Sequence, residues 1–359
     1  LLCFLRTHYQ TDIHVFCPAE GPFTEALRQN GIEYTVMPCT NWAYTVRSPG
    51  LWKFPWYRRR CRQHSWPQML EAARQWQPDV VHSNSTVVAA GWQLPEALKV
   101  PHVWHVREFG WADYQLVFPL GKNLLYKKLR AADCVVAISG AIAKAYSDAT
   151  QRINILYNGI GTTETIRSNA EKGRVPVADR HFRFLLVGLL QPGKKQHEAI
   201  RAFARATAAH PEARLVMVGN GQRLYTLLLR GLVRWYGLID KVQFTGYVAQ
   251  PGACYAAADV VLMCSHHEAM GRVTAEGMSY GKPVIGFRGG ATPEIIKENH
   301  NGWLYDDVHA LGKRMEYALQ HPEECRQLGS AAFEYALEHF SDERYASGFH
   351  QILSDCLKR

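Results

Sequence analysis

A chain of 359 residues is longer than one α/β core requires, and it predicts two domains of about 150 to 180 residues each. Its 47% hydrophobic and 20% charged residues exclude a disordered chain, and no apolar run approaches the roughly 18 residues that cross a bilayer. Nine cysteines without C-x-x-C spacing favour free thiols in the cytoplasm. A net charge of +9 favours an anionic partner, but no nucleic-acid-binding signature accompanies it, so no nucleic acid is predicted.

Short apolar runs alternate with helix-like segments along the first 160 residues. The opening LLCFLRTHY reads as the end of a helix, so we expect the first strand and glycine-rich turn of a doubly wound domain to precede it. A helix is predicted over 68–76, where good helix formers stand between Pro67 and Pro78. β-Branched runs predict strands at 12–17, 34–37, 79–82, 102–106, 134–138 and 154–156.

The second half repeats this alternation after a polar, aperiodic stretch at 161–181, which is predicted to be a linker. Strands are predicted at 183–187, 214–218, 242–244, 260–263 and 283–287. The alternation predicts an α/β protein with two Rossmann-like, doubly wound parallel-sheet domains, at 1–160 and 182–340, facing a central cleft. A capped amphipathic helix at 341–359 is expected to pack back towards the N-terminal domain.

The densest signal is SHHEAMGRVTAEGMSYGKPVIGFRGGATPE, residues 265–294. Glu268 follows a predicted strand, and Glu276 lies about one turn inside the helix that comes next. The first N–H groups of a helix lack intrahelical partners and suit an anion such as a diphosphate. Here they belong to Gly271, Arg272, Val273 and Thr274. The two carboxylates would flank that anion and accept sugar and ribose hydroxyls. For this spacing alone, a solvated helix with two unrelated glutamates is the alternative.

In its surroundings this stretch resembles the signature of glycosyltransferase family four. That signature has a Glu, a Gly two or three residues later, a second Glu eight residues after the first, then G-x-P-V-I and a Gly-Gly loop. Other family-like segments occur in the expected order: VVAISGAIAKAY (135–146), ILYNGI (155–160), RFLLVGLLQPGKKQHEAI (183–200), VMVGNG (216–221) and FTGYV (244–248). The resemblance spans nearly the whole chain. It implies the GT-B fold and a retaining, metal-independent sugar transfer from a UDP- or GDP-linked donor without a cofactor.

The resemblance also implies roles for individual residues. Glu268 would approach the donor sugar, and Glu276 would bind the ribose. Lys194, or Lys195 in a shifted register, would neutralise the diphosphate, because the chain has no D-x-D motif to hold a metal there. The remaining donor-binding residues would be Gly188, Gly219 and Val248.

Two positions depart from the family pattern. Leu189 stands where the family usually has a second phosphate-binding arginine, and Gly161 stands in place of the aspartate of Asn-Gly-x-Asp. Arg272, on the other loop, is the candidate for supplying part of the missing positive charge.

A polar cluster ends the predicted strand in VPHVWHVREFG, residues 100–110. The family often has a histidine at the end of this strand, near the reacting sugar. The matching place falls on Arg107, and His105 lies two residues earlier on the same face. Either side chain would hydrogen-bond the sugar, with Glu108 orienting them, and a structural histidine is the alternative.

Aromatic and basic residues are interleaved in NWAYTVRSPGLWKFPWYRRRCRQHSWP, residues 41–67. This pattern suits an anionic membrane surface, and a loop that packs its tryptophans on the core is the alternative. The residues concerned are Trp42, Trp52, Trp56, Trp66, Arg58, Arg59, Arg60 and Arg62.

Together these patterns predict a hexosyltransferase of cell-surface polysaccharide synthesis. The acceptor would be a saccharide or a lipid-linked saccharide at the inner face of the cell membrane. A non-catalytic homologue that binds a nucleotide sugar or a partner enzyme is the alternative, and a nucleotide-sugar epimerase is a weaker rival. The G-x-G of GNGQRL lacks the third glycine of a dinucleotide site, which argues against a dehydrogenase.

Overall fold

The computed structural model describes residues 1–37, 41–45, 66–88, 90–175 and 181–358. The chain divides into two compact units. Unit 1 comprises 1–157 and 343–359, and unit 2 comprises 158–342. The sequence predicts domain boundaries near 160 and 341, a few residues from these divisions.

Unit 1 is built on a parallel sheet of four strands in the order β4-β5-β7-β8. The strands are β4 (Val81–Asn84), β5 (His102–Val106), β7 (Cys134–Ala137) and β8 (Ile153–Ile155). Two smaller pairs accompany this sheet, parallel β1–β2 and antiparallel β3–β6. They comprise β1 (His14–Cys17), β2 (Glu33–Val36), β3 (Tyr44–Thr45) and β6 (Leu116–Val117). The fully buried β5 and β7 form the centre of the unit.

The helices of unit 1 include the last one of the chain. They are α1 (Leu2–Tyr9), α2 (Pro22–Gln29), α4 (Trp66–Trp76), α5 (Ala90–Leu98), α6 (Trp111–Tyr114), α7 (Lys122–Ala131), α8 (Gly140–Ala145) and α17 (Asp342–Leu357). In α17, Phe349 and Leu353 pack with Leu5, Val103 and Val136 in one buried cluster. The C-terminal helix is thus part of the core around the β5–β7 sheet, because its apolar residues recur at helical spacing.

Unit 2 contains one parallel sheet of six strands in the order β11-β10-β9-β12-β13-β14. The strands are β9 (Phe182–Val187), β10 (Ala213–Val218), β11 (Val242–Gly246), β12 (Val260–Met263), β13 (Val284–Phe287) and β14 (Gly302–Tyr305). Numbered along the chain, this order is 3-2-1-4-5-6, the doubly wound order of dinucleotide-binding folds. All neighbouring strands are parallel, so every carboxyl end lies at the same edge of the sheet.

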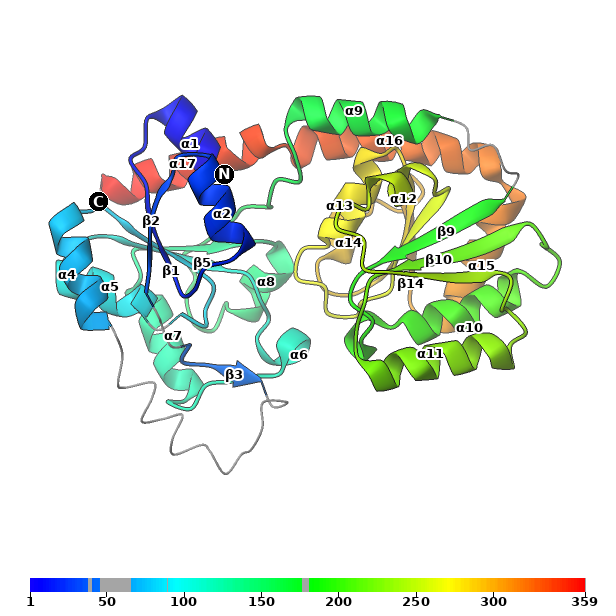
Figure 1. The fold of residues 1–359 in the computed structure, drawn as a ribbon, viewed down its shortest axis with the longest axis horizontal. Helices are drawn as coiled ribbons and strands as arrows, with labels where there is room; N and C mark the ends of the chain where they lie inside the picture. Colours follow the sequence, from blue (N-terminus) through cyan, green and yellow to red (C-terminus); the bar gives the residue numbers. More distant parts are fainter. Residues whose placement is uncertain (38–40, 46–65, 89, 176–180, 359) are drawn as a thin grey trace. The chain divides into compact units, whose positions relative to one another are not determined.

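Helices cover both faces of this sheet (Figure 1). One layer holds α10 (Gln196–Ala206), α11 (Arg223–Trp235) and α15 (Val308–Gln320). The other holds α9 (Thr163–Arg174), α12 (Gly252–Ala256), α13 (Arg272–Ser279) and α16 (Pro322–His339), and the short α14 (Thr292–Ile295) follows β13. A large buried cluster lies under the first layer and includes Phe184, Phe203, Leu215 and Leu229. Its burial contributes about 25 cal/mol per Å² of apolar surface and fixes the strand ends that carry the site.

The structure confirms the predicted α/β class with parallel sheets and corrects several details. Each of the eleven predicted strands has an observed counterpart, and the sequence missed β3, β6 and β14. The prediction of an irregular linker at 161–181 is wrong for 163–174, which form α9. The Thr162 side chain caps this helix by accepting from the Thr165 N–H at 3.0 Å. No helix among the described ranges combines the length and the apolarity needed to cross a bilayer.

Candidate functional site

The candidate site lies at the carboxyl edge of the unit 2 sheet, between β9 and β12. There the order 3-2-1-4-5-6 reverses, because strand 1 is β9 and strand 4 is β12. Open α/β sheets bind their ligands outside the strand ends at this switch point, since the two flanking loops run in opposite directions. The loops concerned follow Val187 and Met263.

Lys194 and Glu268 come from these two loops and meet there. A short 3₁₀ helix, Pro192–Lys194, follows β9 and carries the lysine. Lys194 Nζ donates to Glu268 Oε2 at 2.8 Å. The lysine side chain is 33% exposed and the glutamate 15%, so a ligand can reach a pair that is partly shielded from water. The predicted cation and the first predicted carboxylate are therefore neighbours.

Lys195 points to a different partner. Its Nζ lies 3.4 Å from Glu198 Oε1, and Glu198 also pairs with His266, whose Nε2 lies 3.0 Å from Oε2. The His266 ring stacks on Phe287 with 3.7 Å between centroids. Of the two alternatives that the sequence leaves open, Lys194 is thus the one beside Glu268.

Glycines let the loops of this edge approach one another closely. A Cβ on Gly219, at φ +136°, would lie 2.1 Å from the Gly188 oxygen. A Cβ on Gly290, at φ +58°, would lie 2.5 Å from the Glu268 oxygen, which accepts from the Ala291 N–H at 2.8 Å. The backbone of Glu268 is therefore fixed by the loop after β13, whose Gly289-Gly290 pair the sequence singles out.

The N-terminus of α13 lies directly after Glu268. Gly271 caps it in the left-handed region at φ +85°, where side chains are strained. The prediction of free N–H groups at 271–274 is wrong for Thr274, which donates to the Gly271 oxygen at 2.9 Å. The Thr274 hydroxyl is buried without a hydrogen-bond partner among the described residues. Gly271, Arg272 and Val273 retain the N–H groups predicted to face an anion.

Glu276 is held by two neighbours. The Tyr255 hydroxyl donates to Oε2 at 2.9 Å, and Arg272 Nη2 donates to Oε1 at 3.1 Å. Burial, together with the Glu276 carboxylate, raises the pKa of Tyr255 well above its usual value, so the hydroxyl stays protonated and donating. Sequence reasoning missed Tyr255, whose only signal is its place in a short helix before β12. Arg272 already pairs with Glu276 and is not placed solely for a phosphate.

The other predicted donor residues line the same edge. Gly188 follows β9 and donates its N–H to the Val218 oxygen at 2.9 Å. Val248 lies in the loop after β11, where the preceding Tyr247 N–H donates to Asn220 Oδ1 at 3.1 Å. Leu189, in place of the family's arginine, is 60% exposed.

In unit 1 the structure gives His105 and Arg107 different environments. The His105 ring is fully buried beside Phe349 and His82, and neither ring nitrogen has a hydrogen-bond partner among the described residues. Burial, assisted by the Arg107 charge, lowers the pKa of His105 to about 2. The ring is a neutral core group of unit 1, as in the alternative of a structural histidine, and the contact of His105 with a donor sugar stays a prediction.

Arg107 is half-buried and is held by its own unit. Its guanidinium donates to the Tyr345 hydroxyl at 3.0 Å and also bonds Asn84. The orienting role of Glu108 stays a prediction, and the structure gives this residue other partners. That carboxylate accepts from the Ser85 hydroxyl at 2.8 Å and from the Thr86 N–H at 2.6 Å.

Most of the predicted membrane segment 41–67 lies outside the described residues, including its four arginines, Trp52 and Trp56. Trp42 is described, and it is a core residue with no exposed surface. It donates from Nε1 to the Thr86 oxygen at 2.6 Å and packs edge-on against Phe118. For Trp42 the alternative of a tryptophan packed on the core is correct.

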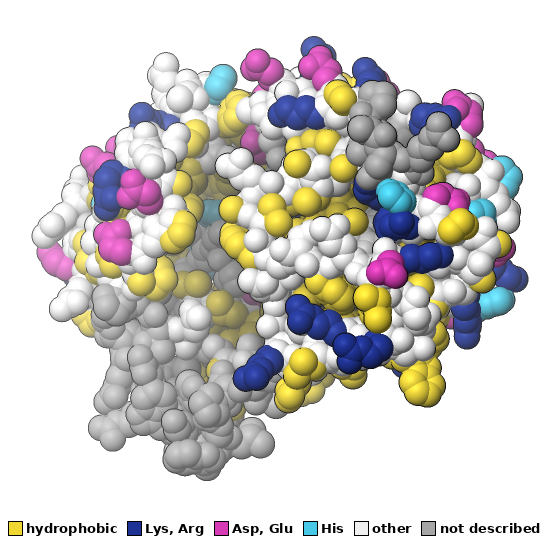
Figure 2. All heavy atoms as spheres, turned by 45° about the vertical axis from the view of Figure 1, so that its right-hand side comes forward, with side chains coloured by type: hydrophobic (Ala, Val, Ile, Leu, Met, Phe, Trp, Pro, Cys, Tyr) yellow, Lys and Arg dark blue, Asp and Glu magenta, His cyan; other side chains and the backbone are white. Residues whose placement is uncertain are grey.

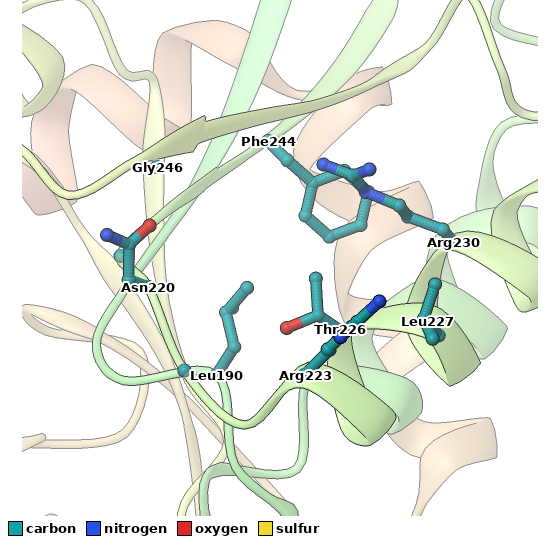
Figure 3. Close-up of a pocket in the computed structure, with 10 residues that line it drawn as sticks. Leu190, Asn220, Arg223, Thr226, Leu227, Arg230, Phe244 and Gly246 are labelled. Carbon is teal, nitrogen blue, oxygen red and sulfur yellow. The ribbon is translucent and has the colours of Figure 1, made fainter.

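A cavity of about 480 Å³ lies between α11 and the ends of β10 and β11 (Figure 3). Leu190 and Asn220 close one side of it, and Arg223, Arg230 and Phe244 line the other. Of the predicted site residues only Gly219 borders it. Across the described part of the chain, no three His, Cys, Asp or Glu side chains are grouped to hold a metal ion.

Comparison with known families covers most of the chain. The family model of Glycosyltransferase Family 4 matches residues 10–164, and that of Glycosyl transferases group 1 matches residues 168–335. The two matches meet near the division between the units.

Individual proteins give the same likeness. The N-acetyl-alpha-D-glucosaminyl L-malate synthase of Bacillus anthracis is 26% identical over 67% of this chain and 64% of its own length. The D-inositol 3-phosphate glycosyltransferase of Segniliparus rotundus is 29% identical over 76% of this chain and 65% of its own length. The chain thus spans slightly less than two thirds of these relatives.

Among solved structures, that of Anabaena Alr3699/HepE in complex with UDP-glucose matches with a TM-score of 0.76 and 21% identity. The match covers 99% of this chain and 94% of that one. It confirms the fold that the sequence predicts.

Proposed function

The chain belongs to glycosyltransferase family four, and on that premise we propose that it transfers a sugar from a nucleotide-sugar donor to an acceptor hydroxyl. The observation that carries the proposal is the Lys194–Glu268 pair at the switch point of a doubly wound sheet. A cation and a carboxylate 2.8 Å apart match the two ends of such a donor, an anionic diphosphate and a hydroxylated sugar.

In this proposal the diphosphate takes the place of Glu268 as partner of the Lys194 ammonium. The N–H groups at the start of α13 provide a second source of positive potential. Glu268 then accepts from sugar hydroxyls, and Glu276, oriented by Tyr255, accepts from the ribose. Positive groups placed before the reaction stabilise the charge that grows on the leaving diphosphate.

The proposed transfer proceeds with retention. The bond from the anomeric carbon to the diphosphate oxygen breaks, and the acceptor oxygen bonds to that carbon on the same face. The departing diphosphate oxygen takes the acceptor proton, so no protein nucleophile is needed. Lys194 and the α13 amides supply the charge stabilisation, so we propose that turnover is independent of a metal and survives a chelator.

We further propose a saccharide or lipid-linked saccharide as acceptor, in cytoplasmic synthesis of a cell-surface polysaccharide. The arginines of 41–67 support attachment to an anionic inner leaflet, since each basic residue near such a surface contributes about 1 kcal/mol. Replacing Arg58, Arg59, Arg60 and Arg62 by Gln should weaken binding to anionic vesicles and leave hydrolysis of soluble donor intact. Unchanged vesicle binding would refute this attachment.

The function is tested by incubating the protein with UDP-, GDP- and ADP-sugars and with free or lipid-linked saccharides. NMR of the product reads the anomeric configuration, and a hexose product with retained configuration is expected. An inverted product would overturn the retaining step. Donor binding without transfer to any acceptor would instead favour the non-catalytic alternative, and a changed sugar without acceptor would indicate an epimerase.

A further inference from the structure

Helix α11 carries an exposed apolar face that no other described part of the chain covers. Leu224 is 81% exposed and Trp235 84%, and Leu227 and Leu228 are more than half exposed. A single exposed leucine is ordinary, but a row of them on one helix marks an interaction site.

The helix presents three stripes in cross-section. Tyr225, Leu229 and Val233, spaced by four, are buried against the sheet. Two exposed stripes lie beside each other, each with the i, i+4, i+7, i+11 spacing that keeps residues on one face. One stripe is apolar and consists of Leu224, Leu228, Gly231 and Trp235. The other is basic and consists of Arg223, Leu227, Arg230 and Arg234.

The charge of this surface is of one sign. No Asp or Glu occurs between residues 223 and 239, and the three arginines are exposed. Figure 2 shows Lys and Arg side chains gathered beside hydrophobic ones along the lower rim of unit 2, where Figure 1 places α11. The basic stripe also borders the cavity, where the Arg230 guanidinium lies 5.9 Å from the centre of the Phe244 ring (Figure 3).

We propose that α11 is a membrane-docking helix that lies in the surface of an anionic bilayer. Its leucines and Trp235 would enter the boundary between headgroups and acyl chains, and its arginines would pair with lipid phosphates. This inference goes beyond the proposed function, because it requires neither donor binding nor catalysis.

Charge complementarity selects a lipid surface over a second copy of the chain. In a two-fold dimer the same face meets itself, so the three arginines of one copy would face those of the other. Like charges placed opposite one another oppose association, whereas anionic headgroups neutralise every arginine.

The test is co-sedimentation of the full chain with vesicles of phosphatidylcholine alone or with about 30% phosphatidylglycerol, which makes the surface strongly anionic. The charge variant is Arg223→Gln/Arg230→Gln/Arg234→Gln, and its control is Arg28→Gln/Arg152→Gln/Arg326→Gln, which removes three other exposed arginines. The anionic vesicles should bind the unmodified chain. The charge variant should lose roughly 100-fold in affinity, at about fivefold per arginine, and the control much less.

A second variant separates the apolar contribution from the charge. Leu224→Ser/Leu228→Ser/Trp235→Ser leaves the arginines in place and should also lose vesicle binding, while Leu357→Ser, at a residue 49% exposed, should not. Unfolding midpoints within a few degrees of the unmodified chain establish that the variants fold. Because the arginines of 41–67 are proposed to bind the same vesicles, the decisive result is the change in affinity. An affinity for anionic vesicles that is unchanged in both α11 variants overturns the proposal, as does a dimer in light scattering that the apolar variant dissolves in the absence of vesicles.

Discussion

Lys194 has two roles that a single substitution can separate. In the structure it balances Glu268, and in the proposed reaction it stabilises the leaving diphosphate. Both depend on a charge held at one place, since a preorganised cation contributes more to the transition state than one that must reorient. Lys195 provides a comparison one residue away, because it pairs with Glu198 instead.

We therefore predict that Lys194→Ala lowers turnover by about 100-fold or more, as removal of one preorganised charge stabiliser does. Steady-state rates with the preferred donor provide the measurement. The exposed Lys313→Ala on α15 is the matched control and should retain full activity. Equal losses in the Lys194 and Lys195 variants would show that no single lysine holds the diphosphate.

At the residue scale, the sequence identified Lys194 and Glu268 but not the side chains that surround the site. Lys194 and Glu268 meet because they lie in loops that follow two neighbouring parallel strands, β9 and β12, and both loops are at the same edge of the sheet. The family-like motifs mark both of these loops in the sequence. Tyr255 and the Glu198–His266 pair were missed, because side-chain partners from other segments leave no local pattern. The burial of His105 was not predicted, because alternation along a strand does not tell whether a helix covers that face, and here Phe349 of α17 packs on the ring.

At the scale of elements, the loops after β12 and β13 are held together by backbone contacts, so a change in one should displace the other. Gly290→Ala forces a Cβ to within 2.5 Å of the Glu268 oxygen at a positive φ, so the loop carrying Glu268 must shift. We predict a loss of about 1–3 kcal/mol in unfolding free energy together with weaker donor binding. Gly231→Ala, in the open interior of α11, should instead stabilise by about 0.5–1 kcal/mol. Urea unfolding and donor titration compare the two variants, and equal effects would contradict this account.

Three buried histidines on strands β4 and β5 make the stability of unit 1 sensitive to acid. Burial lowers the pKa of His82 to about 3, of His102 to about 4 and of His105 to about 2, all below the unfolded value of about 6.5. Well above pH 6.5, at about pH 7.5 and higher, all three are neutral in both states. As the pH falls from about 6.5 towards 4, the unfolded chain binds protons at these histidines and the folded chain does not. The unfolding free energy therefore falls by up to about 4 kcal/mol per pH unit.

His105→Leu should reduce this pH dependence by roughly one third, since it removes one of the three protons. Unfolding midpoints measured from pH 7.5 to 5 test the prediction. An unchanged slope would mean that His105 titrates normally in the folded chain. Because the ring is buried, donor hydrolysis at pH 7.5 should persist in this variant, and its loss would instead support the predicted contact of His105 with the donor sugar.

At the scale of the whole molecule, the alternation of strands and helices was enough to predict two parallel-sheet units. The structure adds the order of the strands, which depends on long-range packing and places the site at β9 and β12. The sequence did not predict α9, because most of its residues are polar and only Ile166 and Ala170 are fully buried. The short β3 and β6 pair across 71 residues of sequence, beyond the reach of local patterns.

The central claim is that the carboxyl edge of unit 2 binds a nucleotide sugar, and calorimetric titration with UDP, GDP and ADP tests it most directly. One nucleotide should bind, and Glu276→Ala should weaken that binding by about tenfold or more, because one charged hydrogen bond to the ribose contributes roughly 1.5–3 kcal/mol. Glu298→Ala removes a carboxylate that pairs with Arg288 and Arg314 instead, and this variant should bind as the unmodified chain does. Absence of binding to all three nucleotides, or equal affinity in the Glu276 and Glu298 variants, would contradict the account.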